Sequence, residues 1–205
     1  MKTIFYIDGF NFYYGVCRNR PDGLKHRWLD IAELCRRLMS DADIAEIKYF
    51  TARAPSPVGT PRTQAAYLDA LRTLPKVTII EGKYLTSNRR MPLADDPTQT
   101  VRVVKHEEKG TDVNIACHML IDAFRQHCER LAVISNDSDL VYPIRFVREM
   151  GLSVYVFNPQ IRPSHDLTKA ATKTQNIFTD TIARCMLSDP ITTADGATIR
   201  KPVNW

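Results

Sequence analysis

Hydrophobic and β-branched residues along the chain gather into short runs that end at turn-forming or acidic residues. The first run, TIFYID at Thr3 to Asp8, is followed by Gly9, which is typical of a central strand that stops where its first loop begins. Further strands are predicted at Ile44–Thr51, Lys76–Leu85, Val101–Lys105, Leu131–Ser135 and Leu152–Phe157. The pattern therefore places Asp8 at the carboxyl end of a buried strand.

Apolar residues at helical spacing predict helices between these strands. The predicted helices cover Trp28–Met39, Thr63–Leu74, Thr111–Phe124, Leu140–Met150 and Asp166–Thr174, with a short strand or helix through Ile177–Met186. Strand, helix and strand alternate, as in a right-handed crossover unit. We therefore predict an α/β fold with a mainly parallel central sheet.

Two stretches interrupt this alternation. Residues Ala54 to Pro61 contain three prolines, which predict a surface loop. Residues Thr86 to Thr100 are polar with little apolar periodicity, and we interpret them as a flexible, substrate-facing insertion. At 205 residues the chain suits one domain. We expect this domain to cover residues 1–187, with the insertion at 86–100, and residues 188–205 to form a turn-rich C-terminal tail.

Composition narrows the classes of protein. The net charge of +5 favours anionic partners without identifying them. Five cysteines, an odd number with no CxxC pair, argue against a disulfide framework and against a zinc site. No run of about eighteen apolar residues is present to span a membrane, and Asp8 interrupts the stretch that a signal peptide would need. We expect a cytoplasmic protein with no membrane association.

Four aspartates carry the candidate chemistry. Asp8, Asp137 and Asp139 follow two predicted strands, and Asp112 lies in the first turn of a predicted helix. Ligands of open parallel sheets bind beyond the carboxyl ends of the strands, where these groups would converge. Clustered carboxylates repel one another unless a cation compensates, and oxygen ligands favour Mg²⁺ or Mn²⁺ over zinc. The pattern predicts a metal site made by these four residues.

Each aspartate also has a structural explanation. Asp137 or Asp139 would cap the helix that begins near Leu140, and Asp112 would complement a helix dipole. Asp8 has the weakest explanation of this kind, because Phe10 to Tyr14 is not a strongly helical segment. The combination of the four residues, more than any one of them, favours a functional site.

Three segments resemble the NYN-domain family, in its LabA-like branch, which is similar to the PIN-domain nucleases. These segments are YIDGFNFYYG at 6–15, EKGTDVNIACHMLIDAF at 108–124 and VISNDSDLVYPIRFVREMGLSVYVF at 133–157. The resemblance extends over about Lys2 to Ile182. It implies a PIN-like (Rossmannoid) three-layer α/β/α fold and metal-dependent hydrolysis of phosphodiester bonds, commonly in RNA. By motif position it implies Asp8, Asp112, Asp137 and Asp139 as the catalytic metal ligands, with Asn11, Ser135 and Asn136 as supporting residues.

We therefore predict a metal-dependent endoribonuclease that uses Mg²⁺ or Mn²⁺, and we predict that Arg53, Arg62, Lys105 and Lys109 contact substrate phosphates. Two alternatives remain open. One is a module that binds RNA or a nucleotide without turnover, and the other is a metal-dependent phosphatase or another small-molecule enzyme on the same fold. Relatives of this fold often pair, which suggests a homodimer formed through the tail ending at Trp205 or through the insertion at 86–100.

Overall fold

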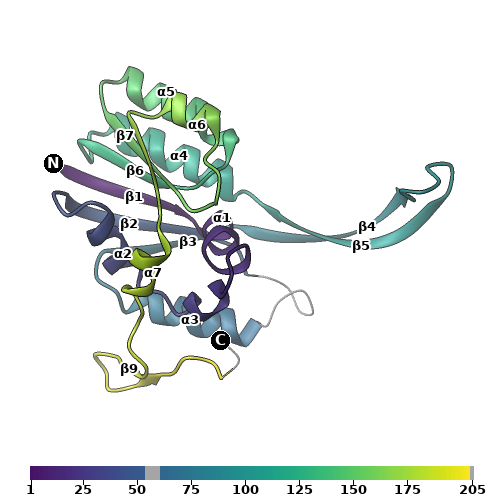
Figure 1. The fold of residues 1–205 in the computed structure, drawn as a ribbon, viewed down its shortest axis with the longest axis horizontal. Coiled ribbons are helices and arrows are strands. Elements are labelled where there is room, and N and C mark those ends of the chain that lie inside the picture. The colour runs from purple at the N-terminus through teal and green to yellow at the C-terminus, as the bar shows by residue number, and fades with distance from the viewer. Residues whose placement is uncertain (54–60, 204–205) are drawn as a thin grey trace.

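A computed structural model describes residues 1–53 and 61–203 and folds them around a six-stranded sheet (Figure 1). In the order β3-β2-β1-β6-β7-β8, its strands are Val77–Glu81, Asp43–Thr51, Lys2–Asp8, Arg130–Ile134, Ser153–Asn158 and Lys173–Asn176. Every neighbouring pair of these strands is parallel, which confirms the predicted α/β sheet. Most of the predicted loop, residues 54–60, and the terminal Trp205 lie outside the described residues.

Helices cover both faces of this sheet. One face carries α1 (Gly9–Tyr13), α2 (Ile31–Leu38), α3 (Pro61–Arg72) and α7 (Thr179–Ala183), with a π-helical turn at Tyr14–Arg18 and a 3-10 turn at Gly23–His26. The other face carries α4 (Thr111–Phe124), α5 (Val141–Glu149) and α6 (His165–Ala170), with a 3-10 turn, η3 (Ser138–Leu140), ahead of α5. Figure 1 shows the resulting three layers, with α4, α5 and α6 above the sheet.

The alternation of side chains along β1 explains why two cores form. Phe5 and Ile7 belong to the cluster beneath α2 and α3, whereas Ile4 and Tyr6 belong to the cluster beneath α4 and α5. A strand buried on both faces has few polar positions, so β1 appears in the sequence as an almost unbroken apolar run. Asp8 is the last residue of this strand and points to the same face as Tyr6.

Residues 83–109 form an antiparallel ribbon that is separate from the main sheet. Strand β4 (Lys83–Pro92) pairs with β5 (Thr100–Lys109) through ten residue pairs, and the ribbon extends far from the body (Figure 1). The sequence predicted one strand through Leu85, a polar segment without regular structure from 86 to 100, and a short strand ending at Lys105. This was wrong in two respects: β3 ends at Glu81, and both strands of the ribbon enter the interval 86–100.

The C-terminal part contains two smaller differences from the sequence-based expectation. The helix predicted at Asp166–Thr174 ends at Ala170, and the polar segment Lys173–Asn176 that follows is the sixth strand, β8. Within residues 188–203 a short antiparallel pair forms between β9 (Ile191–Thr192) and β10 (Thr198–Ile199). In the described part of the chain, no helix has the length and apolar character needed to cross a membrane.

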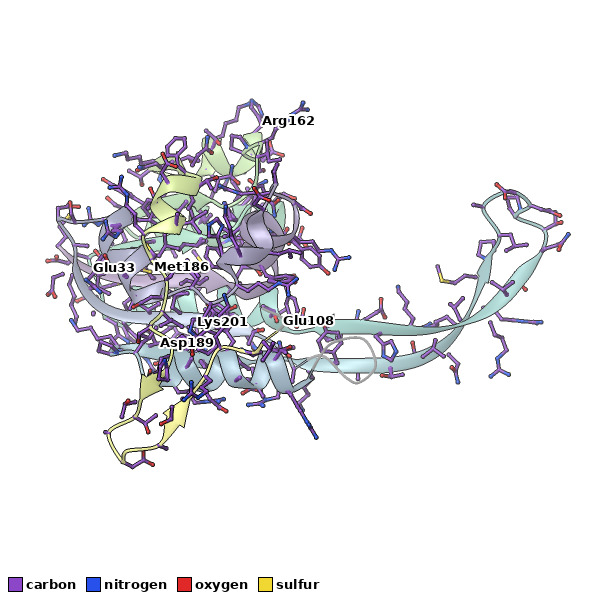
Figure 2. The ribbon with its side chains drawn as sticks, turned by 60° about the horizontal axis from the view of Figure 1, so that its bottom comes forward. Glu33, Glu108, Arg162, Met186, Asp189 and Lys201 are labelled. Atoms are coloured by element: carbon purple, nitrogen blue, oxygen red, sulfur yellow. The ribbon has the colours of Figure 1, made fainter. Side chains whose placement is uncertain are left out.

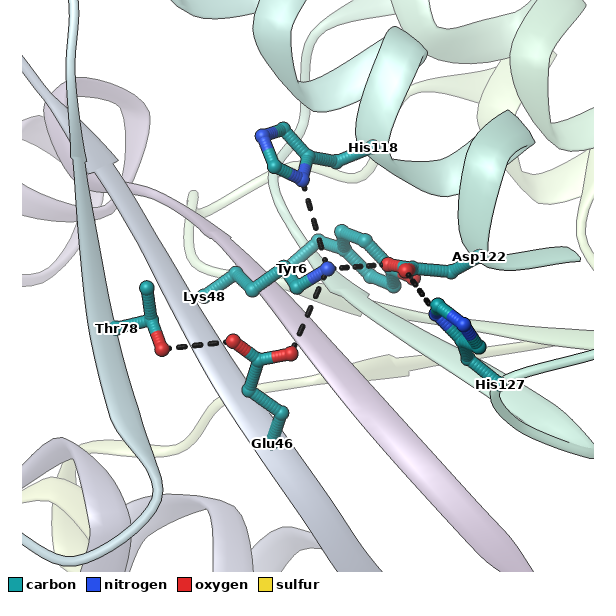
Figure 3. A network of polar contacts seen from close by, with 7 residues as sticks. All are labelled: Tyr6, Glu46, Lys48, Thr78, His118, Asp122 and His127. Atoms are coloured by element: carbon teal, nitrogen blue, oxygen red, sulfur yellow. Dashed lines mark hydrogen bonds and ion pairs between the residues drawn. The ribbon is translucent and has the colours of Figure 1, made fainter. Parts of the chain in front are cut away.

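A buried polar network lies between β1, β2 and α4 (Figure 3). The Nζ of Lys48 in β2 donates to Oδ2 of Asp122 in α4 at 2.5 Å, and the hydroxyl of Tyr6 donates to the same oxygen at 2.7 Å. Lys48 is 6% exposed and Asp122 is 3% exposed, so this ion pair is inside the protein. His118 of α4 lies beside Lys48, with its Nδ1 3.5 Å from Nζ, which places it in a structural network and not at the sheet edge.

Candidate metal centre

Asp8 is held rigidly at the carboxyl end of β1. The residue is buried, with 4% of its surface exposed, and its side chain accepts two hydrogen bonds. Oδ1 accepts the backbone N–H of Asn11 at 3.0 Å, and Oδ2 accepts the hydroxyl of Ser135 at 3.0 Å. Asp8 is therefore the N-cap of α1. The expectation that capping contributes little at this position was wrong, because residues 9–13 do form a helical turn.

Three of the four predicted aspartates converge at the carboxyl edge of the sheet. One carboxylate oxygen from each of Asp8, Asp112 and Asp137 lies within 4.8 Å of the others. Asp8 ends β1, Asp112 belongs to the first turn of α4, and Asp137 follows β6. Residues from three elements far apart in the sequence are thus brought to one point, as expected for ligands of a parallel sheet.

Two of the three carboxyl groups, those of Asp8 and Asp112, lie in an environment that opposes negative charge. Burial raises the pKa of Asp8 to about 6, with a further contribution from the charges of Asp112 and Asp137, although the hydrogen bonds that Asp8 accepts act in the opposite direction. Burial, followed by the charges of Asp137 and Glu108, also raises the pKa of Asp112. A bound cation would reverse this repulsion, so the cluster has the electrostatics of a cation site.

The donor set fits a hard divalent cation. All three groups offer carboxylate oxygens, and the cluster contains no histidine nitrogen or cysteine sulfur. Such ligands suit Mg²⁺ or Mn²⁺, which retain several water molecules and need only a few protein oxygens. Asp137 and Asp112 are partly exposed, so solvent reaches the cluster from one side.

Adding Mg²⁺ or Mn²⁺ to protein treated with EDTA is expected to raise the melting temperature. A ligand at about 100 times its Kd stabilises the folded state by about 2.7 kcal/mol. For a chain of this length that corresponds to a shift of about 5–10 °C. Thermal unfolding followed by circular dichroism measures the shift, and Asp137→Asn should reduce it strongly. A wild-type protein whose melting temperature is insensitive to both metals would contradict the assignment.

Asp139 does not join the three clustered carboxylates. It is exposed, and its backbone N–H donates to Oδ1 of Asp137 at 3.0 Å. Asp137 therefore caps η3 while its carboxylate also belongs to the cluster. The capping explanation and the site explanation both apply to Asp137. Asp139 contributes at longer range, since its charge raises the pKa of Asp112.

The three predicted supporting residues form a hydrogen-bond chain that connects the loops of the site. Ser135 donates to Asp8 and its Oγ accepts the N–H of Asp137 at 3.1 Å. Oδ1 of Asn11 accepts the backbone N–H of Asn136 at 3.0 Å. These bonds connect the junction of β1 and α1 to the loop after β6. They fix the positions of Asp8 and Asp137 relative to each other.

The same chain of hydrogen bonds reaches a further loop, residues 159–162 after β7 (Ser153–Asn158), which the sequence analysis did not single out. The side-chain Nδ2 of Asn136 donates to the carbonyl of Arg162 at 3.0 Å, and Nε2 of Gln160 donates to the carbonyl of Asn11 at 3.1 Å. This loop follows β7 at the same edge of the sheet, and Arg162 is exposed there (Figure 2). An open depression of about 590 Å³ is lined by Asn11, Asn19, Asn136, Gln160, Ile161 and Arg162. The signal available in the sequence was an arginine in a further loop after a predicted strand.

The four predicted phosphate-binding cations lie in different settings. Lys105 and Lys109 belong to β5, and both form ion pairs with Glu107, at 2.6 and 3.8 Å. The guanidinium of Arg53 makes two hydrogen bonds to Glu81, at 2.7 and 3.1 Å, so its charge is already compensated. Arg62 is an exposed residue of the first turn of α3. Lys109 is the one closest in sequence to the cluster, three residues before Asp112.

Glu108 is a second residue near the site that sequence reasoning passed over. Its Oε1 accepts the backbone N–H of Thr111 at 3.0 Å and also the hydroxyl of that residue, and it lies where the ribbon joins the body (Figure 2). It thus binds the amino end of α4, and its charge adds to the field at Asp112. The signal was its place three residues before the predicted helix, which is typical of capping interactions.

The fold and the site together define a class of protein: an α/β protein with three clustered carboxylates at the carboxyl edge of a parallel sheet. The NYN domain family matches residues 2–178, which is most of the chain. The chain therefore belongs to the NYN-domain family, within the PIN-like superfamily.

Two known proteins are similar to this chain over most of its length. The chain is 27% identical over 223 residues to 6-hydroxy-3-succinoylpyridine 3-monooxygenase HspA of Pseudomonas putida, in an alignment that covers 91% of this chain and 70% of that protein. A crystal structure of a protein of unknown function from Vibrio parahaemolyticus superposes with a TM-score of 0.61 at 18% identity, covering 91% of this chain and 96% of the other. At this identity the structural likeness shows a shared fold.

Proposed function

We propose that this protein is a metal-dependent nuclease that hydrolyses internal phosphodiester bonds of RNA. The observation that carries the proposal is the convergence of Asp8, Asp112 and Asp137 within 4.8 Å, in a chain of the NYN-domain family. The family implies a nuclease-like fold, and the cluster has the ligands that divalent-metal hydrolysis needs. RNA as the substrate and Mg²⁺ or Mn²⁺ as the metal belong to the proposal.

In this proposal each residue has a defined task. Asp8, Asp112 and Asp137 would hold the divalent ion, and the hydrogen bonds of Asn11, Ser135 and Asn136 fix Asp8 and Asp137 relative to each other. A divalent ion in such a site lowers the pKa of a bound water and offsets negative charge on the phosphate. The buried side chain of Asp8 is fixed by two hydrogen bonds, so the site is organised before substrate binds. Arg162 lines the depression beside the loop after β7, where its side chain would contact a substrate phosphate.

The proposal is tested with labelled single-stranded RNA, duplex RNA and DNA, each incubated with Mg²⁺, Mn²⁺ or EDTA. We expect cleavage of RNA with either metal and none in EDTA. The products should be oligonucleotides cut at internal positions, and not only single nucleotides released from one end. Tight binding of RNA without cleavage would replace the nuclease with a binding module. Hydrolysis of a generic phosphomonoester beside intact RNA would replace it with a phosphatase.

A second candidate function is supported by the relative from Pseudomonas putida. That protein's name describes monooxygenation of a hydroxypyridine, and the alignment spans 91% of this chain. Monooxygenation consumes dioxygen and two electrons, so the assay monitors oxygen uptake with the hydroxypyridine and an electron donor. Oxygen uptake coupled to a hydroxylated product would favour the oxygenase. RNA cleavage that depends on Asp8 would favour the nuclease.

A further inference from the structure

The ribbon of β4 and β5 stands away from the body with side chains exposed on both faces (Figure 2). Its ten residue pairs run from Lys83↔Lys109 at the base to Pro92↔Thr100, and it belongs to a two-stranded sheet of its own. An isolated two-stranded ribbon is marginally stable in water at best. A ribbon of this length, without a core of its own, points to a ligand or partner that uses its surface.

Positive charge lies along both strands of the ribbon. The strands carry six exposed cations, Lys83, Arg89, Arg90, Arg102, Lys105 and Lys109, against two acidic residues, Glu107 and Glu108. The turn that joins them adds Asp95 and Asp96, so residues 83–109 together carry a net charge of +2. The strands, and not the turn at the tip, are therefore the cationic part of the ribbon.

Two of the cross-strand pairs place like charges directly opposite one another. Lys83 pairs with Lys109, and Arg90 pairs with Arg102. Like charges in facing positions destabilise a ribbon. The described residues provide no ion-pair partner for Arg90 or Arg102 within 4 Å, whereas Lys105 and Lys109 have Glu107. An arrangement that costs stability and is not compensated within the chain indicates a polyanionic ligand.

The base of the ribbon is joined to the candidate metal centre. The ring of Tyr84 lies edge-on to the ring of Phe10, with centroids 6.1 Å apart, and Phe10 is two residues after Asp8. On the other strand, Lys109 is followed by Gly110 and then by α4 with Asp112. Six residues separate Tyr84 from Arg90, so the arginine pair lies about 20 Å from the base. A chain lying along the ribbon would extend from the carboxylate cluster.

We propose that the β4–β5 ribbon is an RNA-binding arm, which contacts the phosphate backbone next to the bond being cut. Arg90 and Arg102 supply its distal contact, and Lys105 and Lys109 supply contacts nearer the cluster. Because these contacts are to phosphates, they position the RNA without reading its sequence. The inference rests on the proposed function for the identity of the ligand.

The test is direct binding of labelled single-stranded RNA in EDTA, where cleavage does not interfere, at several salt concentrations. The variant is Arg90→Gln with Arg102→Gln. We expect its affinity to fall by about tenfold at low salt, and the slope of log K against log salt to decrease by about 1.4, since each lost contact with a single strand contributes about 0.7. The substitution also removes a repulsive pair, so a lower affinity cannot be attributed to an unfolded ribbon.

The matched control is Lys2→Gln with Arg125→Gln, which removes two exposed positive charges elsewhere. Lys2 begins β1 and Arg125 follows α4, so both lie at the edge of the sheet opposite the carboxylate cluster. We expect this variant to bind RNA like the wild type. Equal losses in both variants, or no loss in the ribbon variant, would overturn the inference.

Two further outcomes separate this inference from the proposed function. If the ribbon variant loses RNA affinity but the wild type cuts no RNA, the nuclease proposal is overturned and the RNA-binding arm stands. If the wild type cuts RNA but the ribbon variant binds RNA as tightly as the wild type, the arm is overturned and the nuclease proposal stands. The ribbon also exposes Leu85, Met91 and Val104, so sedimentation of both variants is measured. A dimer that dissociates in the ribbon variant, with RNA affinity unchanged, would assign the ribbon to a second copy of the chain.

Discussion

Asp8→Asn is expected to lower the rate of metal-dependent RNA cleavage at least about a thousandfold, because removing one charged ligand costs several kcal/mol of transition-state stabilisation and each 1.4 kcal/mol or so is tenfold. The amide keeps the size of the side chain and one acceptor oxygen, so the cap on the N–H of Asn11 is retained. It also removes a buried carboxyl group whose pKa is raised by burial, so the variant loses an unfavourable buried charge. The variant should therefore be folded in EDTA, with a melting temperature no lower than that of the wild type.

The matched control is Asp139→Asn, the same chemical change two residues beyond Asp137. Asp139 is exposed and outside the three clustered carboxylates, so its replacement should slow cleavage by less than about tenfold, in keeping with the small energies of exposed charges. Single-turnover cleavage at saturating metal gives both rates. Full activity of Asp8→Asn would exclude the mechanism. Equal losses in the two variants would show that cleavage does not depend specifically on the three clustered carboxylates.

The strands of the central sheet and the convergence of the aspartates could be predicted because strands buried on both faces have a recognisable apolar sequence. β1 and β6 are buried on both faces, so each appears as an apolar run that ends at a polar residue. The end of such a strand is also where its parallel neighbours end. Asp8 and Asp137 were therefore placed at the same edge without any knowledge of the contacts between them.

The ribbon could not be predicted in the same way, because its strands pack against no core. β4 carries the sequence KYLTSNRRMP, in which no face is consistently apolar, and most of its residues are exposed. Without a buried face, alternation gives no signal and register depends on the pairing alone. β8 escaped prediction for a related reason, since a four-residue edge strand of polar composition resembles a loop.

The split among the four aspartates also depended on three-dimensional detail. Asp137 and Asp139 are separated by one residue and have similar surroundings in the sequence. In the structure the turn η3 sends the carboxylate of Asp137 into the cluster and leaves that of Asp139 exposed. A turn of three residues decides this, and its geometry is set by the hydrogen bond from the N–H of Asp139 to Asp137.

The second large effect is expected far from this edge, at the buried network of Lys48. Asp122→Ala should lower the free energy of unfolding by about 3–5 kcal/mol, because removing one member of a buried ion pair leaves the other charge uncompensated. Lys48 would lose a partner at 2.5 Å, and the hydroxyl of Tyr6 would lose its acceptor. Urea denaturation measures the change. Glu46→Ala is the control: Glu46 is 3.5 Å from the same Nζ but half-buried, and its loss should cost less than about 1 kcal/mol.

The contribution of Asp122 should also depend on pH with a defined sign. Burial alone would raise the pKa of Asp122, but the hydrogen bonds from Lys48 and Tyr6 outweigh it and hold that pKa below its usual range. A carboxylate of this kind stabilises the fold above its unfolded pKa of about 3.9, and the stabilisation is lost as the pH falls through the lower folded value. The difference between wild type and Asp122→Ala should therefore be full near neutral pH and shrink in acid. A difference that grows in acid would contradict the ion pair.

Replacing both partners distinguishes the value of the pair from the cost of breaking it. Lys48→Met combined with Asp122→Leu removes both charges and keeps most of the buried volume, so it should recover much of the stability that Asp122→Ala loses. Recovery should be incomplete, because the Tyr6 hydroxyl, whose pKa is raised by burial and by Asp122, would have no acceptor there. A double variant as unstable as Asp122→Ala would mean that the packing of α4 on β1, and not the uncompensated charge, accounts for the loss.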